Sequence, residues 1–310
     1  MNSDAQAIVD RLVLGTMALT PVYNPDADLS EAASVLDVAY DHGIRHYHTA
    51  GHYGDGAAYE ALRGLCSRRK DDLQFIVKIE GALERLFEGP EGIDTSLRAL
   101  GRDSIEYVQI VESREGMPDP VSQTEVLQAL APGQMLRAQL EKARTAGRFR
   151  SLGAEIQTSA HLDLALTLDL DFVVADQSIL RHVVPIEAPK PIADRRLELF
   201  AIRPLAGGWL TPCYARLEDF APRDNRRLWY AVGAPLRARI AAVCEDHGVT
   251  IEQAAFRFLL MRPYPHRIVL GCRTVAQLET AFDPALLEPL PVDLFAALQN
   301  LAPQPFVLEP

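Results

Sequence analysis

The sequence predicts an α/β protein folded as one (β/α)8 TIM barrel, and three observations support this prediction. Short apolar runs alternate with amphipathic helical patterns over the whole 310-residue chain. Eight such runs are present, which is the strand count of this barrel. No G-x-G-x-x-G follows the first run, which argues against a Rossmann-type sheet. Because no linker or change in composition divides the chain, we expect a single domain over residues 1–310.

The predicted strands are separated by helical patterns and by glycine-rich or polar stretches. They cover Leu12–Gly15, Ile44–Ala50, Gln74–Ile79, Tyr107–Val111, Phe149–Ala154, Phe172–Ala175, Leu199–Arg203 and Arg267–Leu270. The segment LSEAASVLDVAYDHG predicts a helix with Ser30 as its N-cap and Gly43 just beyond its end. Residues 112–134 are expected over the C-terminal face, where active sites of this fold lie. The proline-rich tail from residue 283 either packs over the same mouth or, as we expect, holds the last helix in place.

The charge balance excludes one large class of partners. The chain has 31 Lys and Arg against 42 Asp and Glu, a formal net charge of −11, which disfavours nucleic acid binding. No apolar run approaches the length of a membrane span, and the first residues do not form a signal peptide. We therefore expect a cytoplasmic protein without membrane contact that acts on a small molecule.

A series of short motifs resembles the aldo-keto reductase superfamily from about Leu14 to Phe282. In order, the motifs are LGTM at 14–17, TAGHYGDG at 49–56, IVK at 76–78, SLRALGRDSIEYVQI at 96–110, AGRFRSLG at 146–153, Gln177, RPLAGGWL at 203–210 and GCRTVAQL at 271–278. The resemblance implies a (β/α)8 barrel, a monomer or weak homo-oligomer, that binds NADPH and transfers hydride to a carbonyl.

The resemblance also implies a catalytic tetrad, of which this chain keeps two members. Tyr53 matches the tyrosine that acts as acid, and Lys78 matches the lysine that assists it. His48 stands where the family has an aspartate that pairs with the lysine, and Val111 stands where it has a histidine that orients the carbonyl. The tetrad is therefore altered in this chain, and we expect Tyr53, Lys78 and His48 to be the catalytic residues.

The cofactor side departs from the family pattern mainly at the nicotinamide end, although an asparagine usual in the family near Ala281 is also missing. The serine and asparagine that hold the nicotinamide carboxamide are replaced by Glu155 and Ile156. The other cofactor-binding candidates that the resemblance implies are Gln177, Arg203, Leu205, Gly207, Gly271, Arg273 and Gln277, with Arg273 as the partner of a 2′-phosphate. Glu155 is expected in the pocket too, where it could pair with either Lys78 or Arg203.

The substitution of a histidine at position 48 changes the expected chemistry. A neutral histidine can hydrogen-bond Lys78 but cannot offset the cost of burying its ammonium. Lys78 then either gives up its own proton, or it stays charged and makes Tyr53 easier to deprotonate. Both outcomes favour proton abstraction beside a carbonyl over carbonyl protonation.

Other acids and bases near these motifs leave alternatives open. Glu112 follows Val111, and strand alternation predicts that it faces away from the pocket, toward a helix or loop. His52 precedes Tyr53 and could serve as a substitute acid or simply be exposed. His46 and His48 share a strand face, but further ligands with a metal-site spacing are lacking, so no metal is expected.

Three functions remain open from the sequence. The first is an NADPH-dependent reductase of a small apolar or ring-bearing carbonyl or enone. The second is a non-redox isomerase, lyase or cyclase that uses Tyr53, Lys78 and His48 for proton transfer on the same barrel. The third is a catalytically silent binding subunit.

Overall fold

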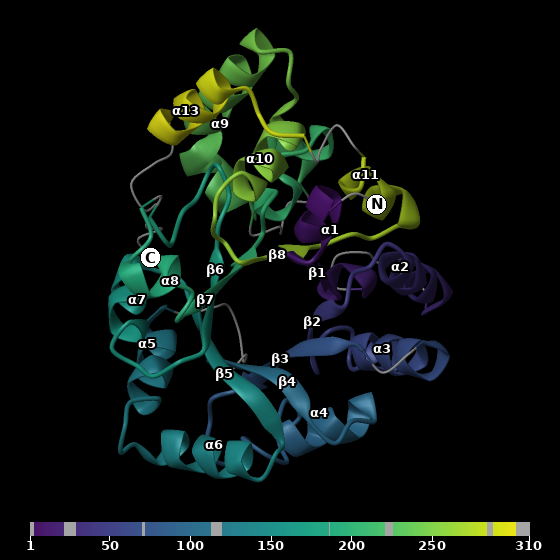
Figure 1. Ribbon diagram of the computed structural model, residues 1–310, viewed down its shortest axis with the longest axis vertical. Coiled ribbons are helices and arrows are strands. Elements are labelled where there is room, and N and C mark those ends of the chain that lie inside the picture. Colours follow the sequence, from purple (N-terminus) through teal and green to yellow (C-terminus); the bar gives the residue numbers. More distant parts are fainter. Residues whose placement is uncertain are drawn as a thin grey trace.

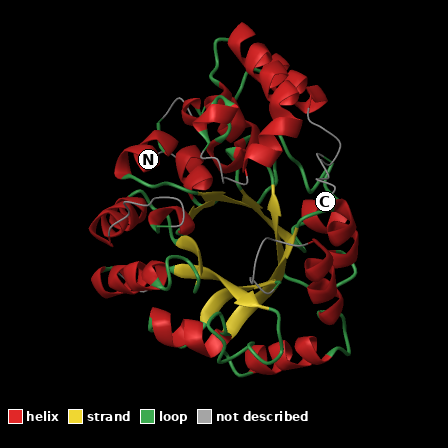
Figure 2. Cartoon of the chain, turned by 180° about the vertical axis from the view of Figure 1, so that it is seen from behind, coloured by secondary structure: helices red, strands yellow, loops and turns green. Residues whose placement is uncertain are grey.

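Eight parallel strands close into a barrel in the computed structural model of the protein, and the helices surround it (Figures 1 and 2). The structure describes residues 3–21, 29–69, 72–112, 120–185, 187–220, 226–283 and 288–301. The strands are β1 (Leu12–Gly15), β2 (His46–Ala50), β3 (Gln74–Glu80), β4 (Ile105–Val111), β5 (Phe149–Ile156), β6 (Phe172–Asp176), β7 (Glu198–Ile202) and β8 (Arg267–Leu270). They follow one another around the barrel in sequence order, and β8 pairs with β1. The predicted fold class is thus confirmed.

The helices follow the strands along the chain and lie outside them (Figure 2). They are α1 (Ser3–Val9), α2 (Leu29–Asp41), α3 (Ala57–Arg68), α4 (Ile93–Leu100), α5 (Pro120–Ala129), α6 (Met135–Thr145), α7 (Ser159–Ala165), α8 (Lys190–Ala193), α9 (Arg226–Asp246), α10 (Ile251–Leu260), α11 (Val275–Ala281) and α13 (Val292–Leu301). Short 3-10 helices are η1 (Met17–Leu19), η2 (Ala206–Gly208), η3 (Pro212–Tyr214) and η4 (Leu217–Asp219).

All eight predicted strands are present, with ends shifted by at most two residues. The predicted helix N-cap at Ser30 is wrong, because α2 already begins at Leu29. Gly43 does lie just past α2 with a φ of 97°, a left-handed conformation that glycine adopts without strain. The part of the proline-rich tail that the structure describes is α13, which packs against α9 (Figure 1).

The inside of the barrel is apolar in its middle layer. Tyr107, Phe172 and Phe200 form an aromatic floor there, with ring centroids 5.0 to 5.5 Å apart. Further apolar side chains complete this cluster: Val13, Ile76, Val174, Ile202 and Val269. Such inward layers of large side chains make a barrel of this kind a packed core and not a pore.

Gly153 on β5 makes room for this floor. A Cβ atom at position 153 would lie 2.5 Å from the carbonyl oxygen of Phe172 and 2.6 Å from its ring carbons. Contacts of that length do not occur between real atoms, so only glycine fits. The aromatic floor therefore depends on a residue without a side chain in the neighbouring strand.

Above the floor, the next inward positions along three strands are polar. Side chains alternate between the two faces of a strand, so Lys78 follows Ile76 on β3 and Gln109 follows Tyr107 on β4. On β5, Glu155 follows Gly153. These side chains, together with His48 on β2, form what we call the polar layer of the barrel.

His182, in the loop after β6, is a buried histidine that makes stability depend on pH. Its side chain is 2% exposed, and neither ring nitrogen has a hydrogen-bond partner among the described residues. Burial and the charge of Arg262 lower its pKa to about 3. The unfolded chain takes up a proton near its ordinary pKa of about 6.5, whereas the folded protein does not until about pH 3. This histidine therefore contributes stability that is present above pH 6.5 and is lost as the pH falls.

Replacing His182 with phenylalanine should weaken this acid sensitivity. For one histidine the free energy of unfolding falls by roughly 1.4 kcal/mol per pH unit between the two pKa values. His182→Phe removes that contribution, and its ring can pack on Phe258, whose centroid lies 5.9 Å from that of His182. Urea unfolding at pH 7.5 and pH 5.0 measures the change. Equal losses of stability on acidification in the variant and the parent protein would contradict the prediction.

Candidate functional site

The polar layer is a connected network of four buried side chains. The Nζ of Lys78 donates to Oε2 of Glu155 at 3.3 Å, and the Nε2 of Gln109 donates to the same oxygen at 3.2 Å. The Oε1 of Gln109 lies 2.7 Å from Nε2 of His48. All four residues are at most 5% exposed, so the charges of Lys78 and Glu155 are removed from water together.

Tyr53 lies beside this layer, in the turn between β2 and α3. Its backbone amide donates to the carbonyl of Ala50, and its ring packs against Ala50, Ala58 and Met17. The Nζ of Lys78 lies 5.9 Å from the centroid of the Tyr53 ring. Tyr53, Lys78 and His48 are thus brought to one region of the structure, as the sequence predicts.

The turn is set by the residues that follow Tyr53. Gly54, Asp55 and Gly56 have φ angles of 61°, 51° and 93°, a left-handed run that lets α3 begin at Ala57. A Cβ at position 54 would lie 2.8 Å from Cβ of Thr20. The sequence YGDG therefore holds Tyr53 against the loop that follows β1.

The two partners considered for Glu155 are resolved in favour of Lys78. Arg203 pairs instead with Asp176, whose Oδ1 lies 2.6 Å from the arginine Nη1. Asp176 also accepts from Nη1 of Arg181 through its other oxygen. Glu155 accepts hydrogen bonds from Lys78 and from Gln109. The carboxylate is a member of the buried network, and its place among the cofactor-binding residues stays a prediction.

Asp176 holds two arginines at the carboxyl end of β6. Its side chain is buried, while those of Arg181 and Arg203 are partly exposed. Asp176→Asn should lower the free energy of unfolding by about 1–3 kcal/mol, because the two arginines lose their charged acceptor. Urea unfolding measures the effect, with Asp194→Asn on the surface as control. An unchanged urea midpoint would contradict this expectation.

His52 does not stand free beside Tyr53. Its Nδ1 is hydrogen-bonded to Oε1 of Glu91, a buried carboxylate. The His52 ring meets the Tyr53 ring edge-on at a centroid distance of 4.6 Å. The histidine is therefore oriented by a carboxylate on one side and by the tyrosine on the other.

The positions that lack the family's polar residues are filled by apolar side chains. Val111 is fully buried and Ile156 is 1% exposed. Glu112 contacts α5 and the residue after β5. Its backbone amide donates to Gln123 on α5, and its Oε2 accepts from Gln157. The prediction that Glu112 faces away from the pocket agrees with these contacts.

The cofactor candidates after β7 and β8 lie on neighbouring loops. Leu205 and Gly207 belong to the loop after β7, where Gly207 has a φ of 67°. Gly271, Arg273 and Gln277 follow β8, which pairs with β7. Gln277 accepts from the backbone amide of Arg273 and thereby shapes this second loop.

Gln177 is engaged differently from the other candidates. It is fully buried, and its amide donates to the carbonyl of Val184 and accepts from the amide of the same residue. The side chain thus braces the loop after β6.

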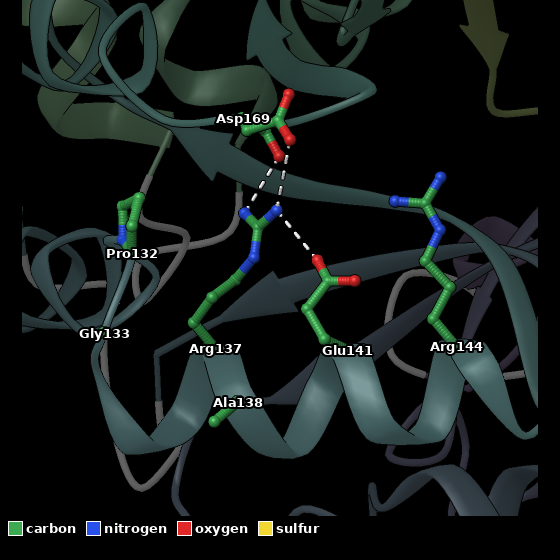
Figure 3. Close-up of a pocket in the computed structure, with 7 residues that line it drawn as sticks. All are labelled: Pro132, Gly133, Arg137, Ala138, Glu141, Arg144 and Asp169. Carbon is green, nitrogen blue, oxygen red and sulfur yellow. Dashed lines mark hydrogen bonds and ion pairs between the residues drawn. The ribbon is translucent and has the colours of Figure 1, made fainter.

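A cavity of about 440 Å³ lies elsewhere on the molecule (Figure 3). Arg137 on α6 reaches across it to the backbone carbonyl of Asp169 at 2.9 Å and to Glu141 at 2.8 Å. Asp169 precedes β6, so this cavity is at the end of the barrel opposite the polar layer. It is a surface clamp between α6 and the loop before β6, and not the site formed by Tyr53 and Lys78.

Two absences hold for the part of the chain that the structure describes. No group of three or more His, Cys, Asp or Glu side chains there is arranged to hold a metal ion. Within the same residues, every helix is too short or too polar to cross a membrane.

Comparisons with known proteins agree with the fold. The model of the Aldo/keto reductase family matches residues 11–302. D-threo-aldose 1-dehydrogenase from Pseudomonas sp. is 26% identical over 320 residues, covering 89% of each chain. The structure of glycerol dehydrogenase AKR11B4 from Gluconobacter oxydans aligns with a TM-score of 0.71 at 18% identity, over 96% of this chain and 94% of that one. The aldo-keto reductase AKR11C1 from Bacillus halodurans aligns with a TM-score of 0.67 at 17% identity, with the same coverage.

Proposed function

The chain belongs to the Aldo/keto reductase family, and we propose that it is an NADP(H)-dependent oxidoreductase that interconverts a small carbonyl compound and its reduced form. The observation that carries this proposal is the position of Lys78 next to the ring of Tyr53 at the edge of a buried polar layer. A phenol beside an ammonium group can give up and take back a proton more readily than a phenol alone. That is the proton exchange that reduction of a carbonyl requires.

The residues of the chain fit the cofactor in part. The loops that follow the neighbouring strands β7 and β8 contain Gly207, Gly271 and the cation Arg273. This arrangement suits a phosphate-bearing nucleotide. The cofactor, when bound, supplies the hydride. The chain's own residues then bind the phosphates, hold the substrate beside Tyr53, and move one proton at the phenol oxygen.

The substrate is proposed as a small, apolar or ring-bearing carbonyl or enone. Val111 offers no hydrogen-bond donor for a carbonyl oxygen, and loss of such a donor typically costs ~10²–10³ in rate. An enone needs less protonation at oxygen and tolerates this loss better. Aldoses and polyols form the second substrate class to screen, since a D-threo-aldose 1-dehydrogenase is a relative of this chain.

We further propose that the protein acts in the cytoplasm as a single domain, as a monomer or weak homo-oligomer, without nucleic acid or membrane partners. The net charge of −11 supports the exclusion of nucleic acid.

Titration with NADPH and NADH, followed by cofactor fluorescence and thermal stability, is the first test of this function. We expect saturable binding of NADPH, followed by oxidation of NADPH at 340 nm with members of the enone, aldehyde and aldose panels. No binding of either nucleotide would refute the redox proposal.

A non-redox proton-transfer enzyme is the second candidate, and the apolar residues Val111 and Ile156 in place of polar ones favour it. Exchange of substrate deuterium without cofactor, and its loss in Tyr53→Phe, would support this candidate. Exchange that survives the substitution would count against it.

A further inference from the structure

We propose that Glu155 on β5 is the counter-ion that keeps Lys78 charged and positioned beside Tyr53, and that Gln109 and His48 hold Glu155 for this role. This inference deepens the proposed function and rests on it. Glu155 is a positioning residue in this account, since it acts on Tyr53 through Lys78. The negative charge that the lysine needs thus comes from β5, while the resemblance alone implies a carboxylate on β2.

The charges of both Lys78 and Glu155 are buried. The side chains of Lys78 and Glu155 are 6% and 4% exposed, and their N–O distance is 3.3 Å. An ammonium or a carboxylate left alone at such burial would neutralise itself or move toward water. Each group therefore stabilises the charged form of the other.

The hydrogen bonds between His48, Gln109 and Glu155 all run in one direction, toward the carboxylate. An ionised carboxylate only accepts, so the amide nitrogen of Gln109 must point to Glu155. The amide oxygen of Gln109 then faces His48, whose Nε2 must carry a hydrogen and donate. The chain of donors runs from His48 through Gln109 to Glu155. Among the four side chains of the polar layer, Glu155 is the one anion.

The side chains near Lys78 also single out Glu155 as its partner. Glu155 from β5 accepts directly from Lys78, and the ring of Tyr53 lies beside the lysine. His48 on β2 is linked to Lys78 through Gln109 and Glu155, and a histidine carries no negative charge. Without Glu155, the ammonium beside the Tyr53 ring would have no counter-ion among the side chains of the polar layer.

The test compares the charge at position 155 with the charge at position 48. Glu155→Gln keeps the shape of the side chain and removes its charge. His48→Asp puts a carboxylate into the same network, three hydrogen bonds away from Lys78. The variants are Glu155→Gln, His48→Asp and the double variant, with Glu141→Gln on the distant clamp as the matched control.

The expected result in steady-state kinetics is a kcat effect with the cofactor affinity kept. For Glu155→Gln we expect kcat to fall by ~10–100-fold, the alkaline limb of its pH profile to move to lower pH, and the Kd for NADPH to stay unchanged. The double variant should recover most of the lost kcat and the parent profile. A Glu155→Gln protein with the parent kcat and pH profile, or a double variant no better than Glu155→Gln, would overturn the proposal.

An unfolding cycle tests the ion pair without any turnover. Urea unfolding of Lys78→Met, Glu155→Gln and the double variant should show a coupling of about tenfold in the unfolding equilibrium constant. Additive effects would overturn the proposal even in a fully active protein. If no carbonyl is reduced, the proposed function fails, and this cycle still decides whether Glu155 is the counter-ion.

Discussion

Replacing Lys78 with methionine should abolish most turnover and also destabilise the barrel. Met has a similar length but no charge, so Tyr53 loses the cation 5.9 Å from its ring centroid. We expect kcat to fall by ~10²–10⁴, the usual contribution of general acid–base catalysis. Binding of NADPH should change little, because the nucleotide candidates lie on the loops after β7 and β8.

The stability effect of the same variant follows from the partner that remains. Glu155 is left buried with Gln109 as its donor, and removal of one member of a buried ion pair typically costs about 3–5 kcal/mol. Urea unfolding measures this loss, and the exposed Lys142→Met on α6 serves as control. If Lys78→Met is as stable as its control, the charge of Glu155 is not held by Lys78.

Removing the hydroxyl of Tyr53 should separate chemistry from structure. Tyr53→Phe retains the ring that packs on Ala50, Ala58 and Met17, so the free energy of unfolding should change by no more than about 1.5 kcal/mol, the contribution of one hydrogen bond. The proton donor is lost, and kcat should fall by ~10²–10⁴ with the Kd for NADPH unchanged.

Single-turnover reduction with saturating NADPH is the appropriate measurement for Tyr53→Phe, since it isolates the chemical step. Tyr40→Phe, whose ring stacks with Arg45 at the surface, is the matched control. A Tyr53→Phe protein that reduces its substrate at the parent rate would show that another group, such as His52, delivers the proton.

The fold could be predicted because the barrel repeats one simple pattern. Each buried parallel strand leaves a short apolar run, and each covering helix leaves an amphipathic one. The strand ends were less certain, and β2 shows why. Its predicted start at Ile44 precedes the strand, which pairs only from His46 onward.

The site could be predicted only where one residue carries the signal. Tyr53 and Lys78 stand in motifs, whereas the partner of Glu155 depends on which side chains meet across the barrel. Two partners fitted the sequence equally well, and the structure selects Lys78 because Arg203 is held by Asp176. Sequence reasoning missed Gln109, although a glutamine in the apolar run YVQIV, two residues before Val111, is a detectable signal.

His52 illustrates the same limit on sequence reasoning. The sequence places it next to Tyr53 but does not reveal Glu91, which approaches from 39 residues further along the chain. A carboxylate that orients a histidine is a contact of tertiary structure, and neither residue predicts the other by spacing.

The aromatic floor of Tyr107, Phe172 and Phe200 has a consequence for the exchange of protons with bulk solvent. The rings lie directly under the polar layer, and Gly153 lets them pack without a gap at β5. These rings thus lie between the Lys78–Glu155 pair and the opposite end of the barrel. If a ligand covers the mouth and Tyr53 transfers a proton as proposed, we expect that proton to be replaced only after the ligand leaves. Reprotonation would then be tied to product release in every catalytic cycle.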